Sequence, residues 1–178
     1  YLMELGIKGK KALVTGGATG IGQAIAIELA NEGVHVVITS RNEEGLNKTL
    51  SMMGGKAAGH YGITCNISDE NSPQRIAEEI WENIGEIDIV VNNAGSTQGI
   101  TDPYCSVSDW RRIFRLNFEV PIEINNLFMP YMKKKDWGRI VNITAGAALE
   151  NSGPVSYCAS KAALTAYTRS MGRILAIE

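Results

Sequence analysis

Two hydrophobicity patterns alternate along the chain and predict its secondary structure. Short apolar runs rich in β-branched residues are typical of strands, and longer segments with an apolar residue every three or four positions are typical of helices. The first pattern predicts strands over residues 10–15, 34–39, part of 57–67, 87–92 and 139–144. The second predicts helices over residues 21–32, 43–53, 73 onward, 108–135 and 156–177.

Glycine, serine and proline mark several ends of these helices. Gly33 is expected to cap the first helix at its carboxyl end, and a Gly-Gly pair at 54–55 to end the second. Ser72 is the expected N-cap of the third helix, directly before Pro73. Because proline lacks an amide donor, the long fourth helix is expected to be interrupted or kinked at two places, near Pro121 and at Pro130.

Strands that alternate with helices along the sequence need right-handed crossover connections, which produce a parallel sheet. The predicted fold class is therefore α/β, a doubly wound, Rossmann-like parallel sheet with strand order 3-2-1-4-5. Residues 1–178 show no linker or internal repeat and are expected to form a single domain. In such sheets ligands bind beyond the carboxyl ends of the strands where the strand order reverses, here between the first and fourth strands.

Composition and charge disfavour several classes of function. The 178 residues are 44% hydrophobic and 20% charged, which suits one soluble globular domain. The formal net charge of −2 gives no sign of a nucleic-acid partner or an anionic membrane surface. No apolar stretch approaches the roughly 18 residues that a membrane span needs, and no signal peptide begins the chain, so a cytoplasmic protein is expected.

Cysteines and histidines give no sign of a metal site. Cys65, Cys105 and Cys158 include no close pair, so free thiols are expected rather than a disulfide framework or a zinc site. His35 and His60 lie in or beside predicted strands, and neither has a second ligand at a suitable spacing. We expect structural roles for both histidines and no bound metal.

The most informative stretch is Leu-Val-Thr-Gly-Gly-Ala-Thr-Gly-Ile-Gly at residues 13–22, between the first strand and the first helix. Glycine accepts positive φ in a turn and lets a ligand approach the backbone closely, which gives Gly16, Gly20 and Gly22 separate roles. Unpaired amides at the start of the helix, around Gly20 and Ile21, would bind a pyrophosphate. An ordinary glycine-rich turn remains the alternative, and a P-loop is disfavoured because no Gly-Lys-Ser/Thr follows.

The spacing Gly-x-x-x-Gly-x-Gly resembles that of the short-chain dehydrogenase/reductase family, and a second motif agrees with it. Tyr157 and Lys161 lie four residues apart in the last predicted helix, so both side chains leave one face. A nearby ammonium would lower the tyrosine pKa and make proton exchange with an alcohol or carbonyl oxygen feasible. A lone Tyr-x-x-x-Lys is most often structural. Here it stands in Tyr-Cys-Ala-Ser-Lys-Ala-Ala-Leu, which resembles the family's catalytic helix.

Three further stretches resemble the family in the same order. Asn-Asn-Ala-Gly at the end of the fourth predicted strand is similar to the segment that lines the cofactor, which implies contacts from Asn93, Ala94 and Gly95. Asn117 matches the asparagine whose backbone in that family holds a water between the catalytic lysine and solvent. Residues 138–143 resemble the strand that leads to the catalytic serine.

Two positions depart from the family pattern in places that matter for chemistry. Ala145 takes the place of the serine that polarises the substrate oxygen. Thr144 is the adjacent hydroxyl, but strand alternation would point it to the opposite face unless the strand end bulges. Either Thr144 substitutes, or Ser152 reaches in from the loop, or the site lacks one donor. Asn66, followed by Ile67, stands where the family commonly has an aspartate near the adenine ring, and an amide can still make that contact.

The end of the second predicted strand indicates the choice of cofactor. An aspartate there would bond the ribose 2′-hydroxyl of NAD and repel a 2′-phosphate. This chain has Ser40 and Arg41 instead, and a charge-assisted contact from the arginine favours NADP(H) over NAD(H). A plain surface role for Arg41 remains the alternative. Thr19 tempers the prediction, because NADP-dependent relatives often carry a basic residue at that place.

The resemblance implies an NADP-dependent oxidoreductase that moves a hydride between nicotinamide C4 and a carbonyl or secondary alcohol, similar to the 3-oxoacyl-carrier-protein reductases. Tyr157 would be the general acid in reduction, Lys161 would hold the nicotinamide ribose, and Asn117 would order the proton relay. The alternative is a cofactor-binding protein with little or no reductase activity, because of Ala145. The family's last strands and substrate lid have no counterpart before Glu178, so this dinucleotide-binding domain is expected to be truncated at its carboxyl end.

The helical region over 109–132 carries more apolar surface than one sheet-facing stripe requires. In the family, two helices pack against their symmetry mates, which implies a homodimer or homotetramer through this region and the helix from residue 156. The alternative is that the prolines turn part of this surface into the monomer. The apolar residues are Trp110, Ile113, Phe114, Leu116, Phe118, Ile122, Ile124, Leu127, Phe128 and Met129.

Overall fold

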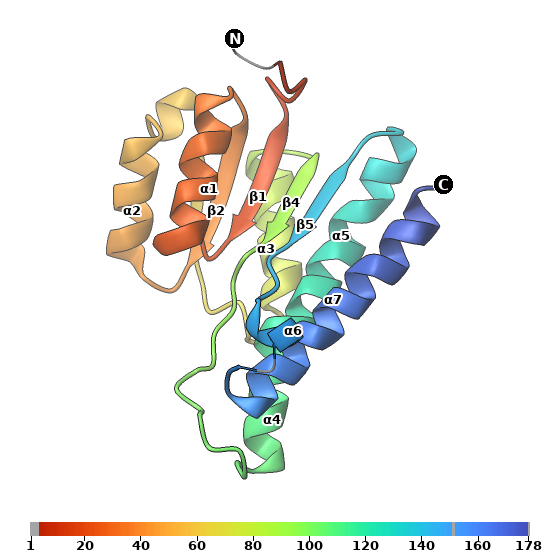
Figure 1. The fold of residues 1–178 in the computed structure, drawn as a ribbon. Coiled ribbons are helices and arrows are strands. Elements are labelled where there is room, and N and C mark those ends of the chain that lie inside the picture. Colours follow the sequence, from red (N-terminus) through yellow and green to blue (C-terminus); the bar gives the residue numbers. More distant parts are fainter. Residues whose placement is uncertain (1–3, 151, 178) are drawn as a thin grey trace.

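Five parallel strands form a single sheet with the order β3-β2-β1-β4-β5. Figure 1 shows β2, β1, β4 and β5 side by side in this sheet. The structure, a computed structural model, describes residues 4–150 and 152–177. The predicted fold class and strand order are confirmed. The strands are β1 Lys11–Thr15, β2 His35–Ser40, β3 Tyr61–Thr64, β4 Ile89–Asn92 and β5 Arg139–Asn142.

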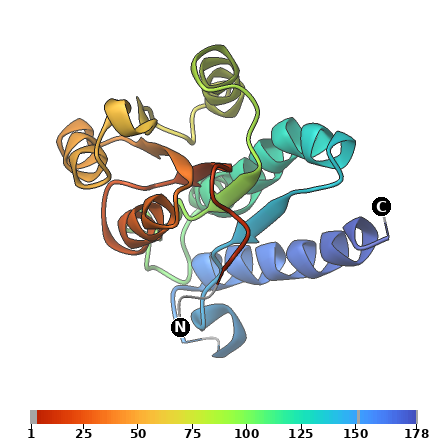
Figure 2. The same cartoon turned by 90° about the horizontal axis from the view of Figure 1, so that it is seen from above.

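Helices cover both faces of this sheet. They are α1 Gly20–Asn31, α2 Glu43–Met52, the 3₁₀ turn η1 Lys56–Ala58, α3 Ser72–Asn83, α4 Val107–Phe114, the π turn η2 Arg115–Glu119, α5 Val120–Lys134, α6 Ala147–Glu150 and α7 Val155–Leu175. The core clusters place α3 and α5 on one face and α1 and α2 on the other. Figure 2 shows this layering from above, with α7 packed along β5 at the end of the sheet.

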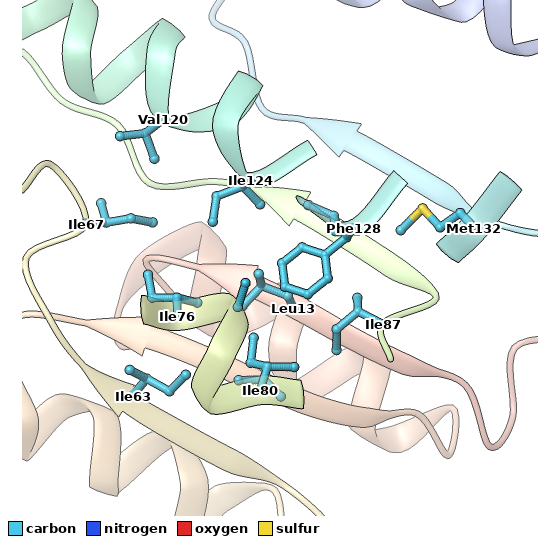
Figure 3. Packing of buried hydrophobic residues seen from close by; sticks show 13 residues of the cluster. Leu13, Ile63, Ile67, Ile76, Ile80, Ile87, Val120, Ile124, Phe128 and Met132 are labelled. Atoms are coloured by element: carbon cyan, nitrogen blue, oxygen red, sulfur yellow. The ribbon is translucent and has the colours of Figure 1, made fainter. Parts of the chain in front are cut away.

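The two core clusters hold β1 at the centre of the fold. Leu13 faces the cluster of α3 and α5, while its neighbours Ala12 and Val14 face α1 and α2. In Figure 3 the Leu13 side chain lies between Phe128 of α5 and Ile80 of α3. A strand buried on both faces reads as a continuous apolar run, which explains the sequence pattern. Burial on both sides fixes the carboxyl ends of β1 and β4 next to each other.

The long helical region is continuous but changes its winding in the middle. Over Arg115–Glu119 the backbone forms a π turn, and the Val120 amide donates to the Arg115 carbonyl. The helix is therefore irregular near Pro121, as predicted, because one turn contains an extra residue. Pro121 itself lies in the first turn of α5, where no amide donor is needed. α5 continues through Pro130, so the helix is not interrupted there, and the alternative of a kink stays a prediction. Pro130 is exposed inside α5, so water can satisfy the carbonyl that it leaves unpaired.

Of two further predicted helix caps, one is confirmed and one is wrong. Gly33 has a φ of 77° directly after α1, and its amide donates to the Ala30 carbonyl at 2.9 Å, so the predicted glycine cap is confirmed. The predicted cap at Ser72 is wrong. Asn71 occupies the N-cap position of α3 without a side-chain capping bond, and Ser72 is already the first helical residue.

Cysteine and histidine side chains take no part in a metal site in the described part of the chain. Cys65, Cys105 and Cys158 are free thiols. His60 accepts the Val36 backbone amide through Nδ1 at 3.1 Å, which is a structural role. Within residues 4–150 and 152–177, no group of three histidine, cysteine, aspartate or glutamate residues could hold a metal ion. No described helix is long and apolar enough to cross a membrane.

Candidate active site

A cavity of about 930 Å³ opens at the carboxyl edge of the sheet, where the strand order reverses. Its walls come from the β1–α1 turn, the ends of β2 and β5, the loops after β3 and β4, the last turn of α4, η2 and the start of α7. Gly20 and Asn117 of the predicted site do not line it. The other predicted residues do: Gly16, Thr19, Ile21, Gly22, Ser40, Arg41, Asn66, Ile67, Asn93, Ala94, Gly95, Thr144, Tyr157 and Lys161.

Backbone conformation and close packing require glycine in the β1–α1 turn. Gly16 and Gly20 have φ values of 68° and 57°, in the left-handed region that favours glycine. A Cβ on Gly22 would lie 2.3 Å from the Gly16 carbonyl oxygen, so this position needs glycine for space. Gly17 adds a requirement that the motif spacing does not predict, because a Cβ there would lie 2.6 Å from Cγ2 of Ile38.

The start of α1 is open to an anion. Thr19 is the N-cap, yet its side chain makes no capping hydrogen bond, and the first turn holds no acidic residue. The first amides of a helix lack intrahelical partners and carry the positive end of its dipole. Because Thr19, Ile21 and Gly22 line the cavity, this helix end suits a pyrophosphate group.

The hydroxyl of Thr15 joins the ends of β1 and β4. Its Oγ1 accepts the backbone amides of Asn93 and Ala94, each at 3.0 Å. The side-chain amide of Asn93 donates in turn to the carbonyl oxygens of Thr15 and Gly16, at 3.0 and 3.1 Å. These four bonds hold the glycine turn against the loop that follows β4, so two walls of the cavity have a fixed spacing.

Lys161 is buried beneath Gly95. The residue is 3% exposed, and its Nζ donates to the Ile143 carbonyl at 2.7 Å. A Cβ on Gly95 would lie 2.9 Å from this Nζ and 2.8 Å from Oδ1 of Asn117. Only glycine at this place lets the loop after β4 pass so close to both polar groups.

Asn117 lies behind the cavity wall and supports the same loop. It is fully buried in the π turn, and its Oδ1 accepts the Ser96 amide at 3.1 Å. Its Nδ2 donates to the carbonyls of Ser96 and Ile113, both at 2.9 Å. The side chain is engaged at both ends, so a proton relay through this residue would use its backbone.

Thr144 lies at the cavity wall, whereas Ala145 and Ser152 do not. β5 ends at Asn142, so the alternation expected of a strand that reaches residue 144 does not apply to Thr144. Its exposed side chain lines the cavity together with Tyr157. Ser152 is exposed outside the cavity. Of the two hydroxyls that the sequence offers, Thr144 lines the cavity and Ser152 does not.

Arg41 lines the cavity just beyond the end of β2. Its side chain is exposed and has no hydrogen-bond or ion-pair partner in the described part of the chain. Ser40 beside it accepts the Asn42 backbone amide through Oγ at 3.0 Å. Across the cavity, Asn66 donates through Nδ2 to Asp69 Oδ1 at 2.6 Å, so its amide is held by its own loop.

Motif spacing does not predict three arginines that also line the cavity. Arg111 and Arg112 lie in the last turn of α4, and Arg115 begins η2. The sequence signal is Arg-Arg-Ile-Phe-Arg, in which the first and last arginines share a helix face. Nothing in the sequence alone shows that this helix face meets the carboxyl edge of the sheet.

Comparison with known proteins agrees with this geometry. The family model described as short chain dehydrogenase matches residues 10–178. The chain belongs to the short-chain dehydrogenase family. A 3-oxoacyl-[acyl-carrier-protein] reductase of Haemophilus influenzae is 34% identical to this dehydrogenase over 171 residues, which cover 96% of this chain and 69% of the relative.

Solved structures of dehydrogenases share the fold. A 7α-hydroxysteroid dehydrogenase complexed with NADH and 7-oxo glycochenodeoxycholic acid has a TM-score of 0.86 and 32% identity, covering 96% of this chain and 67% of its own. A variant of actinorhodin polyketide ketoreductase with NADPH has a TM-score of 0.85 and 29% identity, covering 94% of this chain and 66% of its own. This short-chain dehydrogenase is therefore an NAD(P)-dependent oxidoreductase.

The residues of the cavity fit a nicotinamide nucleotide. Gly16, Gly22 and Gly95 keep side chains out of the places where the chain segments approach most closely. The uncapped start of α1 offers amide donors to a pyrophosphate, and the guanidinium of Arg41 has no partner among the described residues. Both features present positive charge where a dinucleotide carries negative charge.

Burial shifts the pKa of both residues of the Tyr-x-x-x-Lys motif. Desolvation lowers the pKa of Lys161 to about 8. Desolvation, with a smaller contribution from Cys158, raises the pKa of Tyr157. The lowering of the tyrosine pKa expected from the sequence is wrong for this arrangement, because the lysine ammonium is directed to the Ile143 carbonyl and Tyr157 is half-buried.

The buried ammonium is expected to reduce stability in a pH-dependent way. The pKa of Lys161 is about 8 in the fold against 10.5 for the free group, so the unfolded chain binds more protons between these pH values. The buried charge therefore lowers the free energy of unfolding most below pH 8, and this loss of stability disappears as the pH rises towards 10.5. We expect Lys161→Met to raise the free energy of unfolding near pH 7 by about 1 to 3 kcal/mol, after loss of the Ile143 hydrogen bond.

Urea unfolding followed by circular dichroism near pH 7 and near pH 10 measures this effect, and the gain is expected to fall by more than half at the higher pH. Lys48→Met, on the exposed surface of α2, is the matched control and should show no such pH dependence. A Lys161→Met variant less stable than the parent near pH 7 would contradict the prediction, and would mean that the bond to Ile143 outweighs the buried charge.

Proposed function

We propose that this dehydrogenase is an NADPH-dependent reductase that converts the 3-oxo group of an acyl thioester to a secondary alcohol. The observation that carries the proposal is that Thr144, Tyr157 and Lys161 line one cavity at the switch point of the sheet. Relatives named as 3-oxoacyl-[acyl-carrier-protein] reductases, 34 and 35% identical, support the substrate class. We place the enzyme in the cytoplasm, as the sequence predicts, which cell fractionation would test.

Residues along the carboxyl edge of the sheet would hold the cofactor. The amides at the start of α1 would receive the pyrophosphate, and Ser40 with Arg41 the ribose 2′-phosphate. Asn66 and Ile67 would contact the adenine ring, and Lys161 the hydroxyls of the nicotinamide ribose. When bound, the cofactor supplies the hydride that reaches the carbonyl carbon.

Tyr157 would supply the proton that the carbonyl oxygen takes up during reduction. Burial raises the pKa of this phenol, so it holds its proton throughout the neutral range. Lys161, with a pKa of about 8, is mostly protonated at neutral pH and would replace the proton, with Asn117 keeping the relay ordered. The Thr144 hydroxyl would donate a second hydrogen bond to the oxygen while negative charge develops on it.

Tyr157→Phe removes only the phenolic oxygen and tests the acid. We expect turnover to fall by at least about 10²- to 10⁴-fold, while NADPH affinity stays near that of the parent. A panel of ketones and 3-oxoacyl thioesters assayed by NADPH absorbance measures turnover, and fluorescence titration measures affinity. Turnover at the parent rate would remove Tyr157 from this role. NADPH binding without turnover of any compound by the parent would support the binding-only alternative instead.

Thr144→Val tests the second hydroxyl with a side chain of similar shape. Loss of one donor to a developing oxyanion typically lowers the rate by about 10²- to 10³-fold, and we expect kcat to fall by that amount. Thr144→Ser keeps the hydroxyl and is the matched control, expected to retain most of the activity. Equal activities of the valine and serine variants would show that the site works without this donor.

Arg41→Ala tests the choice of cofactor. We expect the parent to bind NADPH more tightly than NADH, and this variant to lose about ten- to a hundredfold of that preference, because a hydrogen bond to a charged group contributes about 1.5 to 3 kcal/mol. Arg139→Ala removes the same kind of charge at the opposite, amino-terminal edge of the sheet and is the control. An unchanged ratio of the two dissociation constants in Arg41→Ala would remove Arg41 from cofactor selection.

We also propose a homodimer or homotetramer that uses α5 and α7. Part of the apolar surface that motivates this is satisfied inside the monomer, since Phe114 and Phe118 contact the rings of Trp110 and Tyr167. On α7, Val155 and Ile174 are each 49% exposed and remain available for a partner. Light scattering of the full-length enzyme at micromolar concentration is expected to give a multiple of its own chain mass, and a monomer would contradict the proposal.

A further inference from the structure

Basic side chains dominate the cavity. Arg41, Arg111, Arg112, Arg115 and Lys161 line it, and no aspartate or glutamate of the described residues does. The chain as a whole carries a formal net charge of −2, so the positive lining is a local feature. A cleft lined by one sign of charge concentrates ligands of the opposite sign.

Two of these cations already have hydrogen-bond partners within the fold. Arg115 forms an ion pair with Glu123 and donates through Nε to the Ser68 carbonyl at 3.2 Å. Lys161 donates to the Ile143 carbonyl. The bonds of Arg115 tie η2 to the loop after β3, so this arginine belongs to the scaffold and needs no external anion.

Arg111 and Arg112 remain available for a ligand. Arg111 is exposed, and its side chain has no hydrogen bond or ion pair within residues 4–150 and 152–177. The side chain of Arg112 is 59% exposed, and its guanidinium contacts Asp109 Oδ1 at 3.3 Å and Gln98 Oε1 at 3.5 Å. Exposed contacts of this kind contribute little stability, so the arginine gives up little by turning its donors to an anion.

Gln98 fixes the arginine pair at the cavity. Its side-chain Nε2 donates to the Arg112 carbonyl at 3.0 Å, and Gln98 itself lines the cavity. Its backbone has a φ of 50°, which is uncommon for a residue other than glycine. A strained backbone conformation persists only where the surrounding contacts hold it in place, and such strain is frequent at ligand sites. The loop after β4 thus ties the last turn of α4 to the cavity wall.

The proposed cofactor contacts account for Arg41 but not for this pair. Arg41 and the start of α1 follow β2 and β1, on one side of the switch point. The arginine pair lies on α4, which follows β4 and packs against α7, as Figure 1 shows. Because Tyr157 stands in the first turn of α7, the pair lies on the side of the reacting group.

We propose that Arg111 and Arg112 bind the phosphate of the substrate's thioester carrier, the phosphopantetheine phosphate that acyl-carrier-protein and coenzyme A thioesters share. The inference rests on the proposed reductase function. Two planar guanidinium groups present forked donors that match phosphate oxygens and neutralise a dianion. The phosphate would be held at α4 while the 3-oxo group reaches Tyr157.

The test compares 3-oxobutyryl thioesters of N-acetylcysteamine, which has no phosphate, of phosphopantetheine and of coenzyme A. We expect kcat/KM to favour the phosphopantetheine over the N-acetylcysteamine thioester. Arg111→Ala should lower this preference about tenfold, and the double variant with Arg112→Ala about a hundredfold. Arg139→Ala, at the opposite edge of the sheet, is the matched control and should leave the preference unchanged.

Several outcomes would overturn the inference and leave the reductase function standing. One is equal kcat/KM for the two smaller thioesters in the parent, and another is an unchanged ratio in the double variant. A preference confined to the coenzyme A thioester would assign the arginines to its adenosine phosphates instead. Weaker NADPH binding by Arg111→Ala in a fluorescence titration would assign that arginine to the cofactor.

Calorimetry separates this inference from the proposed function, because it needs no turnover. Phosphopantetheine should bind more tightly than pantetheine, and the difference should disappear in the double variant. If no thioester is reduced, the proposed function fails, and this binding difference still decides whether the arginines hold a phosphate. Equal binding of the two compounds by the parent would overturn the inference.

Discussion

The hydroxyl of Thr15 is the contact on which the rest of the site depends. At the switch point the chain leaves β1 and β4 in different directions, so the amides that follow β4 cannot continue the strand ladder. Buried amides need an acceptor, and a missing one costs about 1 to 3 kcal/mol for each group. Thr15, 1% exposed, accepts from both Asn93 and Ala94. This oxygen joins the glycine turn to the loop over Lys161, and the side chains of Asn93 and Asn117 hold the same loop.

The chain also retains a charge that its own fold disfavours. Lys161 is almost fully buried, and within the described residues its ammonium donates to a neutral carbonyl oxygen and to no carboxylate. A side chain optimised for packing alone would be apolar here, since an unpaired ammonium loses most of its hydration. Strongly perturbed groups of this kind cluster at functional sites, where stability is given up for a reactive arrangement. Gly95 lies directly above the ammonium, and it also gives up stability for the site, because a side chain there would cover the ammonium.

Sequence reasoning succeeds here where a local signal decides the structure. Buried strands bounded by turns predict the sheet, and the positive φ of Gly16 and Gly20 is a property of the residue itself. It fails where the answer depends on neighbours. The alternation applied to Thr144 assumes a strand that in fact ends at Asn142, and the pKa of Tyr157 depends on where the lysine ammonium points. The position of the α4 arginines at the cavity could not be predicted from the sequence, because it depends on how that helix is rotated about its axis.

That rotation is set by the π turn Arg115–Glu119, which holds one residue more than an α-helical turn, as after a single-residue insertion. Successive helical residues point about 100° apart, so the residue count here fixes the phase of α4 relative to α5. α5 must keep Ile124 and Phe128 in the core. The loss of one codon in this turn would therefore keep the sheet and the contacts of α5 while turning Arg111 away from the cavity and Asn117 away from the Ser96 amide that it holds.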